Sequence, residues 1–182
     1  MFELKLASIV EDKLYTLVKS DGTDVFNQCF DNWQDPQYLY DFFNEHNEVL
    51  RYYGMSAKEA TKQALTESKQ FYLKILNIAE GKTDVTTLDY DIFQPLHPRD
   101  DFDLPLISAK AYGPRKPTSF LRLYAIRISD GTYIIIGGLI KTTQELQETE
   151  EGEEMLKELR TLGEYLRKKG FQDAFDLGVL IV

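Results

Sequence analysis

Five basic side chains between residues 107 and 129 are the part of this chain best suited to chemistry on an anion. No acidic residue interrupts them, although the whole chain carries a formal net charge of −9. Arginine and lysine bind phosphate oxygens, and the planar arginine fork can match a phosphate with two parallel hydrogen bonds. The stretch therefore predicts an anion site, with an ordinary solvated loop as the alternative. Its basic residues are Lys110, Arg115, Lys116, Arg122 and Arg127.

Two of these arginines lie in a stretch that predicts a β-hairpin. Residues 120–128 and 132–139 are rich in β-branched and aromatic side chains, and Asp130-Gly131 between them is a strong hairpin-turn signal. Alternation along the first strand places Arg122 and Tyr124 on one face and an aliphatic row on the other. We therefore expect Arg122 to be solvent-accessible beside Tyr124.

Composition argues against several classes of protein. The acidic balance argues against a non-specific nucleic-acid binder. One cysteine (Cys29) and two isolated histidines (His46 and His97) supply neither a disulfide framework nor a zinc site, so no metal or cofactor is expected. No apolar run reaches membrane-spanning length, and the N-terminus lacks the form of a signal peptide, so we expect a cytoplasmic protein.

The first third of the chain predicts two short strands and a loop. The strands fall at residues 2–6 and 13–19, where apolar and polar residues alternate or β-formers cluster. Residues 22–35 are interpreted as a loop with some turn. Large aromatic side chains are usually buried, so Phe30 and Trp33 are expected to fix this loop to the core.

Two helices follow and form a helical hairpin. Asp35-Pro36 is a helix start, and the first helix is expected to run to about Tyr53. Ser56 and Glu59 have the spacing of a capping box that begins a second helix, which continues to about residue 79. His46, within the first helix, is expected to be structural or exposed.

The last third predicts a strand, the hairpin described above and a final helix. The strand lies within residues 104–112 and leads into a proline-containing loop. Thr142-Thr143-Gln144-Glu145 is a capping-box signature for a helix that ends near Lys169. The apolar tail 178–182 needs burial, either as an edge strand or against a partner, and a homo-oligomer formed through this tail is one expectation.

Together these elements predict an α+β fold in a single domain over residues 1–182. The helical hairpin 36–79 is expected to pack on an antiparallel sheet, with the C-terminal helix after it.

The C-terminal half resembles toxins of the RelE/HigB type, and most of all their phage-derived branch. The resemblance covers roughly residues 104–169: the strand of Arg122 and Tyr124, the Asp-Gly turn, an apolar strand ending in small residues, then Lys141-Thr142-Thr143 and a charged amphipathic helix. It implies a RelE-like core over 36–182 with an N-terminal β extension over 1–35.

The resemblance also implies an activity, partners and residue roles. Members of this family are small ribonucleases that often act on ribosome-bound mRNA and are silenced by an antitoxin protein. Arg122 matches the strand arginine that contacts the scissile phosphate, and Lys141 matches the lysine after the hairpin. The family places basic residues ahead of that strand, where this chain has Lys110, Tyr112, Arg115 and Lys116.

Metal-independent RNA cleavage requires that the 2′-OH be oriented, the phosphorane neutralised and the leaving oxygen protonated. Proton transfer is assigned to one of Tyr112, Tyr124, His97 or Lys110, and Tyr124 is favoured because it lies beside Arg122. Tyrosine and arginine can also stack on bases, and Arg127 is included in the substrate surface. Two alternatives remain open: a non-catalytic regulatory or protein-binding member of the same fold, and a mobile-element accessory protein of unrelated fold.

Overall fold

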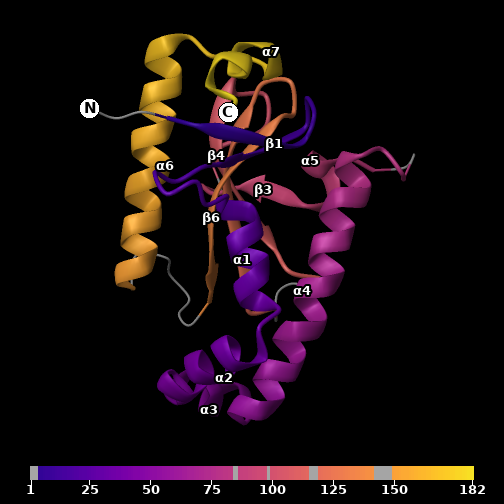
Figure 1. Cartoon of the computed structure of the whole chain (residues 1–182), viewed down its shortest axis with the longest axis vertical. Coiled ribbons are helices and arrows are strands. Elements are labelled where there is room, and N and C mark those ends of the chain that lie inside the picture. The colour runs from indigo at the N-terminus through magenta and orange to yellow at the C-terminus, as the bar shows by residue number, and fades with distance from the viewer. Residues whose placement is uncertain (1–3, 84–85, 98, 115–118, 142–148) are drawn as a thin grey trace.

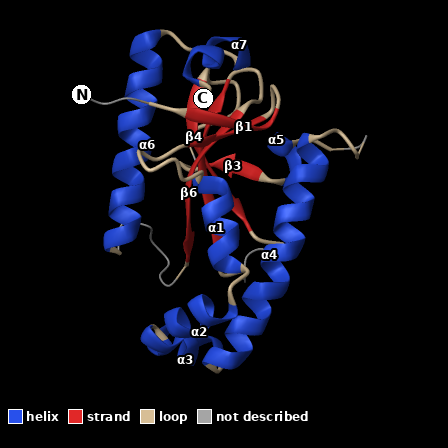
Figure 2. Cartoon of the chain, viewed as in Figure 1, coloured by secondary structure: helices blue, strands red, loops and turns tan. Residues whose placement is uncertain are grey.

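The computed structural model describes the whole chain except residues 1–3, 84–85, 98, 115–118 and 142–148. It confirms the α+β class: a six-stranded sheet lies between helices on its two faces (Figure 2). Only the β2–β6 pair is parallel, and the other neighbours are antiparallel. In spatial order the strands are β1 (Leu6–Val10), β2 (Leu14–Leu17), β6 (Tyr133–Ile140), β5 (Leu121–Ile128), β4 (Leu106–Tyr112) and β3 (Phe93–Pro95).

The predicted hairpin is the β5–β6 pair at the centre of this sheet. Gly131 takes a positive φ of 83°, and Asp130 Oδ1 accepts a hydrogen bond from the Thr132 backbone N–H at 3.1 Å, as an Asp-Gly turn requires. The register shifts between Tyr124 and Ala125, which leaves one extra residue on β6. Both faces of the hairpin are buried.

Helices α1 (Val25–Trp33) and α4 (Ala57–Ala79) lie on the face of the sheet that carries Leu121 and Leu123, here called the α4 face (Figure 1). Helices α2 (Pro36–Glu45) and α3 (Asn47–Tyr53) pack against the first half of α4 below the end of the sheet. The short α5 (Leu88–Asp91) precedes β3.

Two predictions in this region were wrong. Residues 22–35 are not a loop, because residues 25–33 form α1; Phe30 and Trp33 are nonetheless buried, as expected. The helix expected to continue to Tyr53 breaks at His46, whose backbone N and ring Nδ1 lie 3.1 and 2.8 Å from the Phe42 carbonyl oxygen. The capping box is confirmed: the Glu59 N–H donates to Ser56 Oγ at 3.1 Å.

Helix α6 (Glu150–Lys169) crosses the opposite face, here called the α6 face, on a diagonal. Met155 near its start packs over Gly137 of β6, whereas Arg167 near its end donates to the Leu106 carbonyl of β4 at 3.4 Å. Thr149 caps its start, and the predicted cap at Thr142 and Thr143 lies outside the described residues. The expected C-terminal end is confirmed.

The N-terminal strands belong to the sheet itself. The first strand covers Leu6–Val10, so it overlaps the predicted range 2–6 only at Leu6, and residues 2 and 3 of that range lie outside the described residues. Strand β2 pairs with the central strand β6. Helix α7 (Ala174–Leu177) and a 3₁₀ turn (Gly178–Leu180) lead the chain back to β1, where the Val182 N–H donates to the Leu6 carbonyl at 2.9 Å. The tail is thus ordered against the edge strand. Among the described residues, no helix has the length and apolar character needed to cross a membrane.

Candidate functional site

Five of the predicted site residues come together on the α6 face. Lys110 and Tyr112 are on β4, Arg122 and Tyr124 are on β5, and Lys141 follows β6. The strand register places Lys110 opposite Tyr124 and Tyr112 opposite Arg122, so these four side chains share one face. These residues lie at the corner of the sheet formed by the end of β4, the beginning of β5 and the end of β6.

Arg122 lies at the centre of this corner, and its guanidinium carbon is 4.0 Å from the centre of the Tyr112 ring. Its Nη1 donates to the backbone carbonyls of Ser119 at 2.5 Å and Leu121 at 2.8 Å. Only 4% of the residue is exposed, so the expectation of a solvent-accessible Arg122 is wrong. The strand alternation was right, but the surrounding backbone and the Tyr112 ring enclose the side chain.

Tyr112 is the partly exposed phenol of this cluster. Burial acts to raise its pKa, but hydrogen bonding with Lys110 and the positive charges of Lys110, Arg122 and Lys141 outweigh burial, so the pKa is lowered from its ordinary value. The Lys110 ammonium lies 5.5 Å from the ring centre. The positive charges of Lys110, Arg122 and Lys141 therefore all favour the phenolate form of Tyr112.

Tyr124 has the opposite environment. It is 4% exposed, and burial raises the pKa of its phenol to about 12, although the Arg122 charge acts to lower it. A neutral, enclosed phenol is a poor proton acceptor near neutral pH. Of the two tyrosines beside Arg122, Tyr112 is therefore the better placed for proton transfer, contrary to the sequence-based preference.

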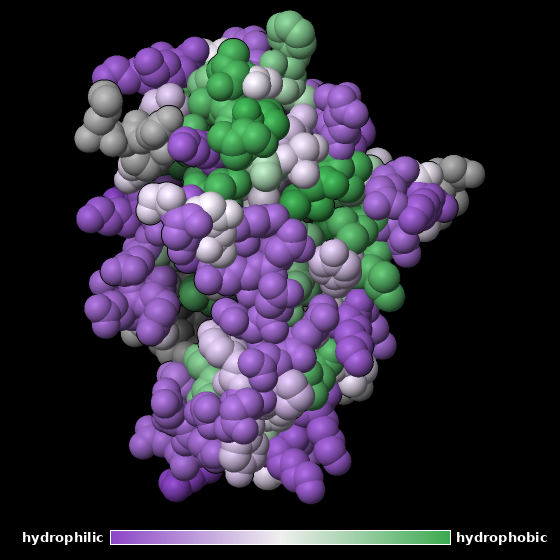
Figure 3. Space-filling view, viewed as in Figure 1, coloured by the Kyte–Doolittle hydropathy of each residue, from purple (hydrophilic) through white to green (hydrophobic). Residues whose placement is uncertain are grey.

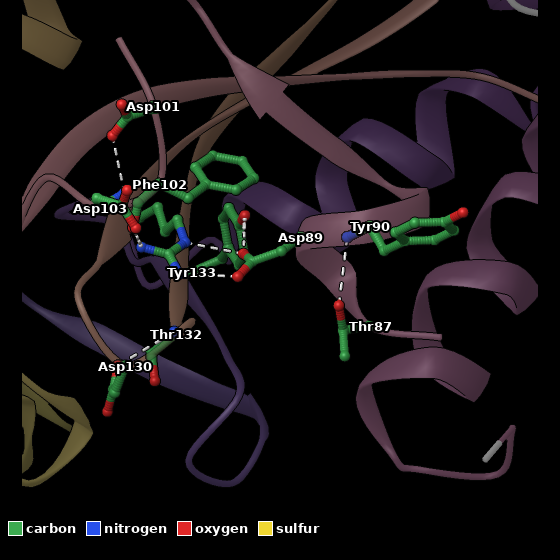
Figure 4. Close-up of polar contacts among 10 residues, drawn as sticks. Thr87, Asp89, Tyr90, Asp101, Phe102, Asp103, Asp130, Thr132 and Tyr133 are labelled. Atoms are coloured by element: carbon green, nitrogen blue, oxygen red, sulfur yellow. Dashed lines mark hydrogen bonds and ion pairs between the residues drawn. The ribbon is translucent and has the colours of Figure 1, made fainter. Parts of the chain in front are cut away.

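Arg127 does not join this cluster, because it lies on the α4 face. Its Nε and Nη2 donate to the two carboxylate oxygens of Asp89 at 2.8 and 2.7 Å, and Nη1 donates to the Phe102 carbonyl. The Tyr133 hydroxyl also donates to Asp89, as Figure 4 shows. Arg127 is 6% exposed and ion-paired, so its assignment to the same substrate surface as Arg122 is corrected.

These hydrogen-bond donors shift the pKa of the Asp89 carboxylate. Burial acts to raise its pKa, but the hydrogen bonds from Arg127 and Tyr133 outweigh burial, so the pKa is lowered. Burial and the bond to Asp89 in turn raise the pKa of Tyr133. The network joins α5 to strands β5 and β6, which is a structural role.

Sequence reasoning missed Glu67 and Ser119. Glu67 on α4 is fully buried, and its carboxylate accepts hydrogen bonds from Ser119 Oγ and Gln63 Nε2, both at 3.0 Å. Because the Ser119 carbonyl in turn accepts from Arg122, α4 helps to position the arginine. An isolated glutamate within a helical apolar pattern was the available signal, since glutamate is seldom fully buried unless paired.

The remaining predicted residues lie elsewhere. Arg115 and Lys116 fall outside the described residues, and His97 is exposed in the segment between β3 and β4. Among the described residues, no group of three or more histidine, cysteine, aspartate or glutamate side chains is arranged to hold a metal ion. Neither a protein-family description, nor a characterised protein, nor a solved structure matches this chain.

Proposed function

We propose that this protein is a metal-independent endoribonuclease, the toxin component of a cytoplasmic toxin–antitoxin pair that cuts mRNA. One observation carries the proposal: the Tyr112 phenol, which is partly exposed and has a lowered pKa, lies among Lys110, Arg122 and Lys141 at one corner of the sheet. A phenol whose pKa is lowered by neighbouring cations is a better general base than an ordinary tyrosine, and the same cations suit the cleavage of a phosphodiester by its neighbouring hydroxyl.

In the proposed reaction the Tyr112 phenolate accepts the proton of the ribose 2′-OH. The 2′ oxygen then forms a bond to phosphorus while the bond to the 5′ oxygen breaks, which yields a 2′,3′-cyclic phosphate and a 5′-hydroxyl product. Lys110 and Lys141 neutralise the charge that develops on the non-bridging oxygens, and one of these two ammonium groups protonates the leaving 5′ oxygen. Arg122 acts as a positioning residue, because it is buried beneath Tyr112 and is held by two carbonyls.

The test is cleavage of a single-stranded RNA in the presence of EDTA, with the cyclic phosphate as the product measured. Tyr112→Phe keeps the ring under Arg122 but removes the hydroxyl, so we expect the cleavage rate to fall about 10²-fold or more. Tyr90→Phe is the matched control, because Tyr90 is 82% exposed and lies on α5. Full activity of Tyr112→Phe, or no cleavage by the wild-type chain, contradicts the proposal.

The toxin assignment has a separate test in cells. Induced expression of the wild-type chain is expected to arrest growth, Tyr112→Phe is expected to relieve the arrest, and co-expression of the gene product encoded beside it is expected to restore growth. Growth arrest that persists with Tyr112→Phe separates toxicity from cleavage and contradicts the assignment.

A protein-binding role on the same fold is the second candidate, and exposed apolar side chains near the C-terminus favour it. Phe175, Val179 and Val182 are 89%, 81% and 70% exposed, and Figure 3 shows hydrophobic residues gathered at this end of the molecule. Exposed apolar groups in one region suit a protein contact, with an antitoxin or with a second copy of the chain. Light scattering over a range of concentrations, for wild type and for Phe175→Ser with Val179→Ser, tests the homo-oligomer.

A further inference from the structure

Two exposed tyrosines on α3 lie next to the proposed cleavage site. Tyr52 is 85% exposed and Tyr53 is 50% exposed, and their ring centres are 5.9 Å apart with the ring planes close to perpendicular. Large aromatic side chains are costly to leave in water, and most of those in the described part of the chain are buried or half-buried. Two neighbouring tyrosines in solvent offer ring faces on which a flat ligand can stack.

The pair is connected to the cationic cluster by direct packing. The Tyr53 ring lies 5.7 Å from the ring of Phe120, and the Phe120 carbonyl accepts a hydrogen bond from the Lys141 backbone N–H at 2.7 Å. The Tyr53 phenol also acts electrostatically on the Arg122 guanidinium, as do Tyr112 and Tyr124. The exposed tyrosine pair on α3 is thus connected, through the buried Phe120, to the strand ends that carry Arg122 and Lys141.

We propose that Tyr52 and Tyr53 form a stacking subsite for unpaired bases next to the phosphate that is cut. This inference rests on the proposed ribonuclease function and adds to it a substrate preference and the residues that produce it. A phenol ring stacks on any base but only when the base is unpaired, and such stacking is sequence-tolerant. The substrate is accordingly single-stranded RNA at this position, with weak sequence preference.

RNA fits this surface better than a protein partner does, because the tyrosine pair lies beside cationic residues. The aromatic pair adjoins Lys141 and Arg122 rather than the apolar C-terminal end, and cations beside solvent-exposed rings are what a polyanion with flat bases requires. The exposed Arg51 precedes the pair on α3 and adds a further positive charge. A protein contact at the same rings is the competing outcome.

The experiment measures binding rather than cleavage, so that the two proposals fail separately. The probe is a fluorescein-labelled single-stranded RNA in which every ribose is 2′-O-methylated, which prevents cleavage, and anisotropy gives the dissociation constant. Tyr52→Ala is the main variant because its side chain is largely in solvent, and Tyr52→Phe keeps the ring. Tyr90→Ala is the matched control, since Tyr90 is 82% exposed on α5.

We expect Tyr52→Ala to weaken binding about tenfold, Tyr52→Phe to bind nearly as well as wild type, and Tyr90→Ala to show no change. An abasic substitution in the probe is expected to weaken wild-type binding by a similar factor and to have little further effect on Tyr52→Ala. A duplex of the same sequence is expected to bind more weakly than the single strand.

Equal binding by wild type and Tyr52→Ala overturns the stacking subsite while leaving the phosphate site in place. No binding of any single strand by the wild-type chain overturns both proposals. If Tyr52→Ala binds RNA normally but escapes inhibition by the gene product encoded beside it, the rings contact protein, and the stacking proposal is likewise overturned.

Discussion

Arg122 and Arg127 lie on the same strand, yet they face opposite sides of the sheet and have different partners. Arg127 meets a carboxylate, and this ion pair accounts for its burial. Arg122 meets two backbone carbonyls and an aromatic ring. The Arg122 charge acts to lower the pKa of the neighbouring Tyr112 phenol, whereas Arg127 forms its ion pair with Asp89 on the other side of the sheet.

The burial of Arg122 changes what its removal should do. Arg122→Ala leaves two carbonyls without their donor and opens space beneath Tyr112, so we expect the free energy of unfolding to fall by about 1–3 kcal/mol. Urea denaturation followed by circular dichroism measures this loss. A variant as stable as wild type shows that the arginine is more loosely held than its hydrogen bonds indicate, and that its role is confined to the site.

The lowered pKa of Tyr112 predicts a pH dependence of cleavage. The rate is expected to rise with pH as the phenol ionises and to level off below pH 10, the ordinary value for a tyrosine. Lys110→Ala removes the positive charge that is hydrogen-bonded with the phenol, while burial remains, so the pKa rises and the ascending limb moves to higher pH. Single-turnover rates between pH 6 and pH 10 give both profiles. If the pH–rate profile of Lys110→Ala is the same as that of wild type, a group other than Tyr112 is the general base.

Asp89 predicts a second pH dependence, of stability rather than rate. Its pKa is lower in the folded chain than the unfolded value of about 3.9, so the stability it contributes is present above that value and is lost as the pH falls through the folded pKa. Asp89→Asn should cost about 1–3 kcal/mol at pH 7, with the difference from wild type shrinking in acid. Asp91→Asn, on the same short helix, is the control in urea titrations from pH 2.5 to pH 7.

At the scale of elements, the central strand β6 depends on two glycines that admit neighbouring helices. A side-chain carbon added at Gly138 would lie 2.7 Å from the Trp33 ring and 3.0 Å from the Arg122 carbonyl oxygen. One added at Gly137 would lie 2.5 Å from the terminal methyl group of Met155, which is flexible and can move. An added side chain should therefore be tolerated less well at Gly138 than at Gly137.

We expect Gly138→Ala to destabilise the fold by about 1–3 kcal/mol and Gly137→Ala to cost less, because a rigid ring and a backbone atom cannot yield as a methionine can. Trp33 is the single tryptophan of the chain, so its fluorescence should also change in Gly138→Ala. Equal losses in the two variants, measured in urea, contradict this explanation.

The elements also show what could be predicted from the sequence. The β5–β6 hairpin, the α4 capping box and the end of α6 follow from strong local signals, and the structure has them. Helix α1 was missed because its Asn, Cys and Asp residues are weak helix formers. Its signal was present in the Asp24 cap, whose carboxylate accepts from the Asn27 N–H at 3.1 Å, and in the helical spacing of Phe26, Phe30 and Trp33.

The site could also be predicted only in part, because only its local features leave a signal in the sequence. Strand alternation correctly placed Arg122 and Tyr124 on one face, whereas their pairing with Tyr112 and Lys110 of β4 came from the structure. It could not show which parts of that face α6 and the backbone enclose, because enclosure depends on where a distant helix crosses. Tyr112 is better placed for proton transfer than Tyr124, and Glu67 helps to position Arg122. Both results depend on packing between segments far apart in the sequence.

At the scale of the whole molecule, the described part of the N-terminal segment, residues 4–35, is an integral part of the fold. β2 is hydrogen-bonded to β6 in the sheet, and Leu14, Phe26, Phe30 and Trp33 are core residues. A chain that begins at residue 35 would expose a long, wholly apolar edge on β6. We expect it to aggregate or to lose cooperative unfolding, as measured by circular dichroism and light scattering. A soluble, cooperatively folded truncation would show that residues 36–182 are a separate core.

The β2–β6 pair has a consequence for synthesis on the ribosome. About two thirds of the chain separates its two strands: the Thr132 hydroxyl, just before β6, donates to the Asp12 carbonyl, just before β2, across 120 positions. At the usual rate of translation, of roughly 5–20 residues per second, the N-terminal hairpin waits on the order of ten seconds before its central partner exists. Contacts of this span also slow folding, since the loop must close before they form. The nascent chain therefore carries an unpaired strand edge through most of its synthesis and should be a client for chaperones that bind extended apolar segments.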